Sequence, residues 1–172
     1  MLRVRRLLLC CVVGLGAGLA LLGLRRLTTE PPNWTRIEEG LYVGGSVPEP
    51  PPGTSAVLNL CELQDSYEAP DHVWEPIHDN EPAPNLEWLE RTVNLVAGWR
   101  KEGKTTYIHC RNGVSRSGLV VTAYEMREHG WGREEALAFV RSKREIRPNP
   151  AFLKLLGEWE KKLKGKRGQA PF

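Results

Sequence analysis

Beyond residue 35 the chain contains several short segments with strand character, each bounded by turn-forming residues. They occupy positions 36–44, 56–61 and 105–109, and a weaker run occupies 73–77. Runs of this length that are rich in Val, Ile, Leu and Tyr are typical of strands. We therefore expect four strands, with a pair of glycines ending the first of them.

Longer segments with apolar residues three or four positions apart predict helices between and after these strands. The first begins after Asn85, a favourable N-cap residue, and three more are expected at 116–128, 133–142 and 150–163, the last capped by Asn149. Strands that alternate with helices predict an α/β domain with a central, mostly parallel sheet flanked by helices.

The first 27 residues have a different character. Residues 7–24 contain no charged side chain, and arginines flank them on both sides. A helix of this length spans about 27 Å, near the lower limit for crossing a membrane. We expect an uncleaved single-pass transmembrane helix within residues 1–27. A cleaved signal peptide is the alternative, although residues 17–20 form a poor cleavage site.

The pattern thus divides the chain into four parts. A membrane anchor at 1–27 is followed by a linker at 28–35, an α/β domain at 36–164 and a basic, disordered tail at 165–172. Composition adds that the domain is large enough for one hydrophobic core, because domains commonly contain ~100–150 residues.

Charge is strongly segregated although the formal net charge is only +3. Residues 28–90 contain 13 acids and one base, whereas residues 91–172 contain 18 bases and eight acids. Two halves that neutralise each other in one fold explain this, and the alternative is that the basic half surrounds an anion site. A nucleic-acid partner is not expected, since it would require one coherent basic surface.

The cysteines exclude two further classes. The four cysteines, at positions 10, 11, 61 and 110, form neither a disulfide framework nor the paired spacing of a zinc site. We therefore expect no metal site.

The most informative stretch is His-Cys-Arg-Asn-Gly-Val-Ser-Arg-Ser-Gly at 109–118, between an expected strand and an expected helix. Such a loop directs several backbone N–H groups at one point, next to the positive end of a helix dipole. This is an anion site, formed here by Arg111, Asn112, Gly113, Val114 and Ser115.

Three side chains give this anion site a chemistry. The same field lowers the pKa of the Cys110 thiol and favours a nucleophilic thiolate. The planar guanidinium of Arg116 can hold two phosphate oxygens. The Ser117 hydroxyl can donate to the thiolate or assist its departure. A simple packing role for Cys110 does not explain why these features coincide.

With these residues in place, the chain resembles the dual-specificity branch of the cysteine-dependent protein phosphatases, whose signature is His-Cys-x5-Arg-Ser. Segments 37–45, 57–60 and 147–152 resemble the family's first two strands and the start of its last helix. The resemblance implies the cysteine-phosphatase fold, a phosphocysteine intermediate and an aspartic general acid on a mobile loop. It implies no metal or nucleotide cofactor.

The general acid must face the nucleophile from a loop that follows a neighbouring strand. Asp79, which lies 31 residues before Cys110, fits this description. Glu81 is the serious alternative, whereas Asp71 precedes the expected strand and so lies at its wrong end. The same carboxylate would later accept a proton from the attacking water.

Three further residues have supporting roles. We expect His109 to fix the loop by hydrogen bonding and Asn59 to brace it from the adjacent strand. Cys61 follows one strand as Cys110 follows another, so neighbouring strands would allow a protective Cys61–Cys110 disulfide. The sequence Asn-Leu-Cys at 59–61 resembles that of phosphoinositide-directed relatives that use such a pair of cysteines.

Dual-specificity hydrolysis of phosphotyrosine, phosphoserine or phosphothreonine proteins is the first expectation. Phosphoinositide-selective relatives typically carry Lys in the loop, which here contains only one charged residue before Arg116, Arg111. The anchor nevertheless favours a second candidate, a phospholipid phosphomonoesterase acting on a phosphoinositide or phosphatidylglycerol phosphate. A catalytically silent phosphopeptide-binding module and a sulfur-transfer enzyme are more distant alternatives.

The expected partners are therefore a phosphorylated protein or phospholipid and, through the anchor, a membrane. Three arginines before the apolar segment and two after it slightly favour a cytoplasmic N-terminus. With one membrane span, that orientation would place the catalytic domain on the opposite side. A reactive thiol favours the reducing cytoplasm for the catalytic domain. We give the thiol more weight and expect a membrane protein with a cytoplasmic catalytic domain.

Overall fold

The computed structural model describes residues 31–167. The expected anchor at 1–27 and the last five residues of the expected tail lie outside this range. Within it, no helix is both long and apolar enough to cross a membrane.

A five-stranded sheet forms the centre of the described fold, in the order β1-β2-β5-β3-β4. The strands are β1 (Trp34–Glu38), β2 (Leu41–Gly44), β3 (Ala56–Asn59), β4 (Asp71–Trp74) and β5 (Thr106–His109). The pairs β2–β5, β5–β3 and β3–β4 are parallel, and only β1 runs antiparallel to its neighbour. The expectation of a mostly parallel sheet is confirmed.

Two strand predictions differ from the structure. The apolar run at 36–44 is a hairpin rather than one strand, because Gly40 turns the chain with a φ of 68°. The strand expected at 73–77 is β4, which begins at Asp71 and ends at Trp74. β4 is an edge strand, and none of its residues is fully buried. Its sequence therefore lacks a clear alternation of polar and apolar residues, which is why its bounds were predicted wrongly.

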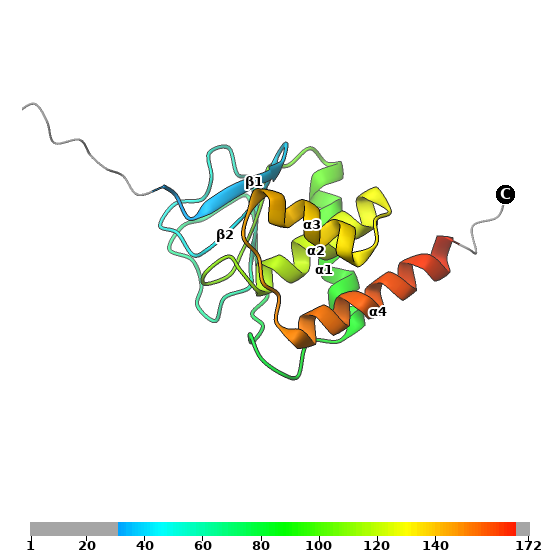
Figure 1. Ribbon diagram of the computed structural model, residues 1–172. Coiled ribbons are helices and arrows are strands. Elements are labelled where there is room, and N and C mark those ends of the chain that lie inside the picture. The colour runs from blue at the N-terminus through cyan, green and yellow to red at the C-terminus, as the bar shows by residue number, and fades with distance from the viewer. Residues whose placement is uncertain (1–30, 168–172) are drawn as a thin grey trace, which may run out of the picture. The chain divides into compact units, whose positions relative to one another are not determined.

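Four helices gather beside the sheet, with α2 between the other three (Figure 1). They are α1 (Leu86–Lys101), α2 (Arg116–His129), α3 (Arg133–Lys143) and α4 (Pro150–Arg167). The Asn85 side chain accepts a hydrogen bond from the Trp88 N–H at 2.8 Å, as its N-cap prediction requires. The domain is longer than expected at both ends, since β1 begins inside the expected linker and α4 continues into the expected tail.

The central position of α2 buries all of its residues from Arg116 to Met126. Most of them are apolar or small and pack between the sheet and the other helices. The two charged residues in this buried stretch are Arg116, at its start, and Glu125, near the other end of the helix. Burial raises the pKa of Glu125 to about 8, and the nearby Glu38 and Glu128 carboxylates add to the shift.

Candidate active site

The loop from Cys110 to Ser115 connects the end of β5 to the start of α2. It turns tightly at Gly113, which has a φ of 69°. A Cβ atom at Gly113 would collide with the backbone of Gly44, so both the turn and the close approach require glycine. The side chains of Arg111 and Asn112 are exposed, while Gly113 and Ser115 are buried.

Cys110 lies at the base of this loop with 2% of its surface exposed. Burial by itself would disfavour the thiolate, but hydrogen bonds from the Ser117 hydroxyl and from loop N–H groups hold the pKa of Cys110 below its ordinary value. The N–H groups are those of Ser117, Val114 and Gly113. The Cys110 Sγ and Ser117 Oγ atoms are 3.4 Å apart.

Substitution Ser117→Ala should raise the pKa of Cys110, because the thiolate loses one of the hydrogen bonds that stabilise it. The rate of Cys110 alkylation by iodoacetamide, measured against pH, should then rise at higher pH than in the unsubstituted chain. Ser117→Thr, which keeps the hydroxyl, is the matched control. An unchanged alkylation profile in Ser117→Ala would contradict this account of the thiolate.

The Arg116 guanidinium is buried at the same sheet edge. Its Nη1 donates to the carbonyl oxygens of Ile77 and Leu60 at 3.2 and 3.4 Å. The same atom lies 2.8 Å from Oε1 of Glu62, and this hydrogen bond lowers the pKa of Glu62. The structure therefore gives Arg116 a carboxylate partner that the sequence analysis missed. The available signal was an acid directly after Cys61, at the carboxyl end of a strand.

Asp79 lies next to the Cys110 loop although 31 residues separate it from Cys110. Its Oδ1 accepts hydrogen bonds from Ser115 Oγ at 2.6 Å and from Asn149 Nδ2 at 2.9 Å. Asn149, known so far only as the cap of α4, also ties Asp79 to the start of that helix.

The two rival carboxylates lie elsewhere. Asp71 is at the opposite edge of the sheet, where it pairs with Lys104 at 2.8 Å. Glu81 lines a surface hollow together with Pro150 and Lys154 of α4. Asp79 is the one of the three that the structure connects to the Cys110 loop.

His109 has the structural environment that its position predicts. It is fully buried, and its Nε2 lies 2.9 Å from Oδ2 of Asp65. The same oxygen lies 3.0 Å from Nε2 of His72. Burial opposes ionisation of Asp65, but the hydrogen bonds from both histidines bring its pKa below the usual value. Asp65 was missed because it lies in a polar loop whose sequence has no regular pattern.

Asn59 does not brace the Cys110 loop as expected. Its Oδ1 accepts a hydrogen bond from the Cys61 N–H at 2.7 Å, and its Nδ2 donates to the Leu63 carbonyl at 3.0 Å. These contacts fix the turn that directly follows β3. The prediction chose the right strand but the wrong loop, because a short amide side chain bonds most readily to backbone two to four residues away.

Cys61 and Cys110 follow neighbouring parallel strands, β3 and β5, and both are free thiols. The Cys61 Sγ lies 3.8 Å from Nδ1 of His109. Burial raises the pKa of Cys61 to about 12, and the charge of Cys110 adds to the shift. The protective disulfide stays a prediction. Peroxide treatment that yields only sulfinic or sulfonic Cys110, with no linked peptide, would refute it.

Arg144 is a further residue that sequence reasoning missed. Its Nε donates to the Gly113 carbonyl at 2.8 Å, and its Nη2 donates to the Asn112 carbonyl at 3.1 Å. It therefore holds the loop by its outward-facing carbonyl oxygens, which leaves the loop N–H groups directed toward the thiol. An arginine directly after an amphipathic helix does not indicate from the sequence that it contacts a loop elsewhere in the fold.

Comparison with known proteins identifies this arrangement. The family model of the dual-specificity phosphatase catalytic domain matches residues 53–162. The chain belongs to this family. It is a hydrolase of the protein-tyrosine-phosphatase class, and the family's cysteine-based phosphoester hydrolysis accounts for the anion loop around Cys110.

Individual relatives support the same assignment. The chain is 33% identical over 133 residues to a putative tyrosine phosphatase, 123R, of Invertebrate iridescent virus 6, covering 75% of this chain and 93% of that protein. It is 35% identical over 109 residues to rat Slingshot homolog 3, a longer phosphatase, covering 62% of this chain and 17% of the relative.

Solved structures show the same dual-specificity phosphatase fold. A mouse putative dual specificity phosphatase, crystallised with zinc tungstate, superposes with a TM-score of 0.75 at 27% identity, covering 81% of this chain and 93% of that chain. PTPMT1 in complex with PI(5)P has the same fold, with a TM-score of 0.71 at 20% identity, covering 79% of this chain and 99% of that chain.

Proposed function

We propose that this phosphatase dephosphorylates phosphotyrosine, phosphoserine or phosphothreonine in proteins through a phosphocysteine intermediate. The Cys110 thiolate attacks phosphorus, and the bond to the leaving oxygen breaks as Asp79 protonates that oxygen. Arg116 and the loop N–H groups stabilise the charge on the equatorial oxygens. Water then attacks the phosphocysteine, Asp79 accepts its proton, and the P–S bond breaks to release phosphate and the thiolate, assisted by Ser117.

One observation carries this mechanism: the contact between Asp79 and the Cys110 loop. Through Ser115 and Asn149, the structure holds a carboxylate at the rim of an anion site that contains a thiol with a lowered pKa. An acid on one side of the phosphate and a nucleophile on the other is the arrangement that in-line phosphoryl transfer requires.

Asp79→Asn should affect substrates according to their leaving groups. An alkyl oxygen needs protonation as it leaves, so kcat for a phosphoserine peptide should fall by ~100-fold or more. p-Nitrophenolate leaves without a proton, and its formation from p-nitrophenyl phosphate should slow far less. Glu81→Gln is the matched control and should leave both rates near their original values. A selective loss in Glu81→Gln instead would transfer the acid role to that residue.

Charge at the site supports a protein substrate over a polyphosphorylated lipid. The loop contributes Arg111 but no lysine, and Glu62 adds a negative charge beside Arg116. Additional phosphates on a headgroup would be repelled by this carboxylate rather than bound. A phosphorylated side chain carries a single phosphate and avoids that penalty.

A membrane phospholipid is the second candidate substrate. It is supported by the apolar segment at 7–24, which we propose anchors the chain with its catalytic domain on the cytoplasmic side, and by the fold shared with PTPMT1. Protease protection in sealed vesicles tests the orientation, since a cytoplasmic domain is cleaved from the cytoplasmic face and a luminal one is protected.

The substrate class is tested by comparing kcat/KM for two sets of substrates with the full-length chain. One set contains phosphotyrosine and phosphothreonine peptides, and the other contains vesicles with phosphatidylglycerol phosphate or a phosphoinositide. We expect the peptides to have the higher kcat/KM. Faster turnover of the vesicles would overturn the protein assignment and leave the cysteine chemistry intact.

A further inference from the structure

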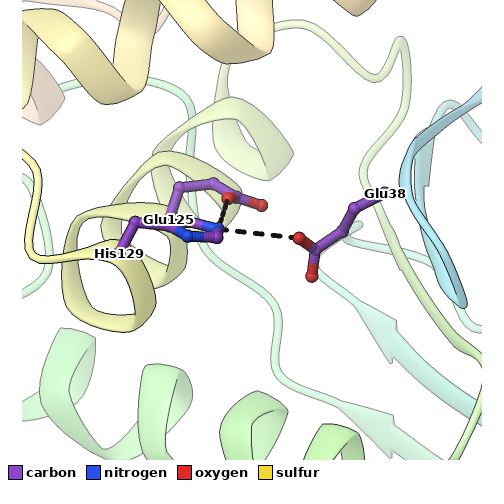
Figure 2. Close-up of side chains that lie close together, drawn as sticks. All are labelled: Glu38, Glu125 and His129. Carbon is purple, nitrogen blue, oxygen red and sulfur yellow. Dashed lines mark ion pairs between the residues drawn. The ribbon is translucent and has the colours of Figure 1, made fainter.

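Three side chains that can bind a metal ion lie together at the far end of α2 (Figure 2). Glu38 comes from the end of β1, and Glu125 and His129 come from the last two turns of α2. Their ligand atoms all lie within 4.8 Å of one another. Since α2 starts at Arg116 and rises 1.5 Å per residue, Glu125 and His129 are roughly 14 and 20 Å along the helix from its start at the Cys110 loop.

The Glu125 carboxylate accepts no hydrogen bond from residues 31–167, and its close contact is the ion pair with His129 (Figure 2). Its side chain is completely buried, and neither oxygen accepts a hydrogen bond. Oε2 lies 3.0 Å from Nε2 of His129, but this contact lacks hydrogen-bond geometry. Buried carboxylates are strongly unfavourable unless a cation or several donors compensate them, so this one requires an explanation.

The nearby guanidinium of Arg100 attracts the Glu125 carboxylate electrostatically but donates no hydrogen bond to it. Nη1 of Arg100 donates to the carbonyl oxygens of Gly40 and Lys104, both at 2.8 Å. Its Nη2 is 4.0 Å from Oε1 of Glu38, the oxygen that faces away from His129. Nη2 also donates to the Glu39 carbonyl oxygen, and Nε donates no hydrogen bond. None of the three nitrogens of Arg100 therefore donates to Glu125.

We propose that Glu38, Glu125 and His129 bind a zinc ion, with water as the fourth ligand. In a tetrahedral site with metal–ligand bonds near 2.0–2.1 Å, the ligand atoms lie about 3.4 Å apart. Nε2 of His129 lies 3.0 Å from Oε2 of Glu125 and 3.6 Å from Oε2 of Glu38, which brackets that value. Two carboxylates and a neutral imidazole also supply the charge that a divalent cation neutralises.

The surroundings favour an ion at this position. The His129 ring stacks on Trp131 at 4.2 Å between centroids, which fixes its orientation toward the two carboxylates. The His129 and Glu38 side chains are 37% and 28% exposed, so an ion and its water ligand have access from solvent. An imidazole ligand favours zinc over magnesium or calcium. A bound ion would tie β1 to the end of α2.

The test is a zinc titration by calorimetry on the full-length chain carrying Cys110→Ser, which removes the competing thiolate. We expect one ion per chain. Adding His129→Gln or Glu38→Gln should weaken binding by ~100-fold or more, since each removes a ligand from a three-residue site. Glu128→Gln is the matched control, because it removes the same charge from the same helix turn and leaves the ligands intact.

Cobalt(II) absorption provides a second measurement. A tetrahedral site of nitrogen and oxygen ligands gives visible d–d bands, which should be absent after His129→Gln, without the thiolate-to-metal charge transfer expected at cysteine. Zinc should also raise the thermal unfolding midpoint of the parent chain but not of the His129→Gln variant. Absence of zinc binding, equal binding after His129→Gln, an equal loss after Glu128→Gln, or a thiolate charge-transfer band would each overturn the proposal.

Discussion

Replacing Cys110 with serine should reduce the hydrolysis of p-nitrophenyl phosphate by ~10^4-fold or more, because no other group can form the covalent intermediate. A serine hydroxyl at this position stays protonated at neutral pH and is a poor nucleophile for phosphorus. The loop N–H groups and Arg116 remain, so the variant should still bind inorganic phosphate or a phosphopeptide. Turnover and binding are thereby separated in one variant.

Cys61→Ser is the matched control for this experiment. Cys61 is also a buried thiol at the carboxyl end of a parallel strand, but burial raises its pKa, so it is not ionised at neutral pH. Its substitution should leave the rate close to that of the unsubstituted chain. If Cys61→Ser lost activity as completely as Cys110→Ser, the loss would no longer identify Cys110 as the nucleophile.

Arg116→Lys should reduce kcat/KM by ~1,000-fold although the positive charge is kept, a loss at the upper end for removal of one oxyanion donor. A guanidinium binds two phosphate oxygens with a rigid, planar pair of N–H groups, whereas an ammonium is a point charge on a flexible stem. Part of the loss arises in the free enzyme, since Glu62 and the carbonyls of Leu60 and Ile77 position the guanidinium.

Arg111→Lys is the corresponding control. The Arg111 side chain is exposed, unlike that of Arg116, so this exchange should change kcat/KM by only a few-fold. Glu62→Gln adds a test of positioning, because it removes the charge that pairs with Arg116 without removing the guanidinium. Equal losses in Arg111→Lys and Arg116→Lys would mean that only the net charge of the loop matters.

Much of this site is predictable because the relevant information is local in the sequence. The Cys110 loop, its glycine and the start of the following helix lie within ten consecutive residues, and the geometry of a strand–loop–helix determines what such residues can do. Asn85 and Asn149 are likewise recognised as helix caps from their immediate neighbours. Asp79 is predicted from the requirement that a general acid follow a strand at the same sheet edge, and the structure shows its contact with the Cys110 loop, while its role as the acid stays a prediction.

The contacts that support the site depend instead on residues distant in the sequence. Asp65 reaches His109 across 44 positions, and Arg144 reaches Gly113 across 31. Neither residue has a neighbour pattern that distinguishes it from a solvated charge. For Asn59 the opposite holds. The sequence analysis predicted a contact with the distant Cys110 loop, but the side chain hydrogen-bonds to the turn that directly follows β3.

The hairpin at 34–44 illustrates a limit of hydrophobic patterns. Apolar residues lie close on both sides of a very short polar turn, Glu39–Gly40, so the segment reads as one strand although it forms two. Gly40, with its left-handed conformation, is where the chain reverses. The metal cluster was not anticipated for a different reason. The cysteine spacing excludes a zinc site among the cysteines only, whereas Glu38, Glu125 and His129 come from distant parts of the sequence and meet only in the folded chain.

Trapping the covalent intermediate tests the central claim most directly. The full-length chain is mixed rapidly with p-nitrophenyl phosphate in the presence of reductant, quenched within the first turnover and digested for mass spectrometry. The account predicts one phosphoryl group on the peptide that contains Cys110, and none after Cys110→Ser. Hydrolysis without any phosphorylated peptide, or with the phosphoryl group on another residue, would contradict it.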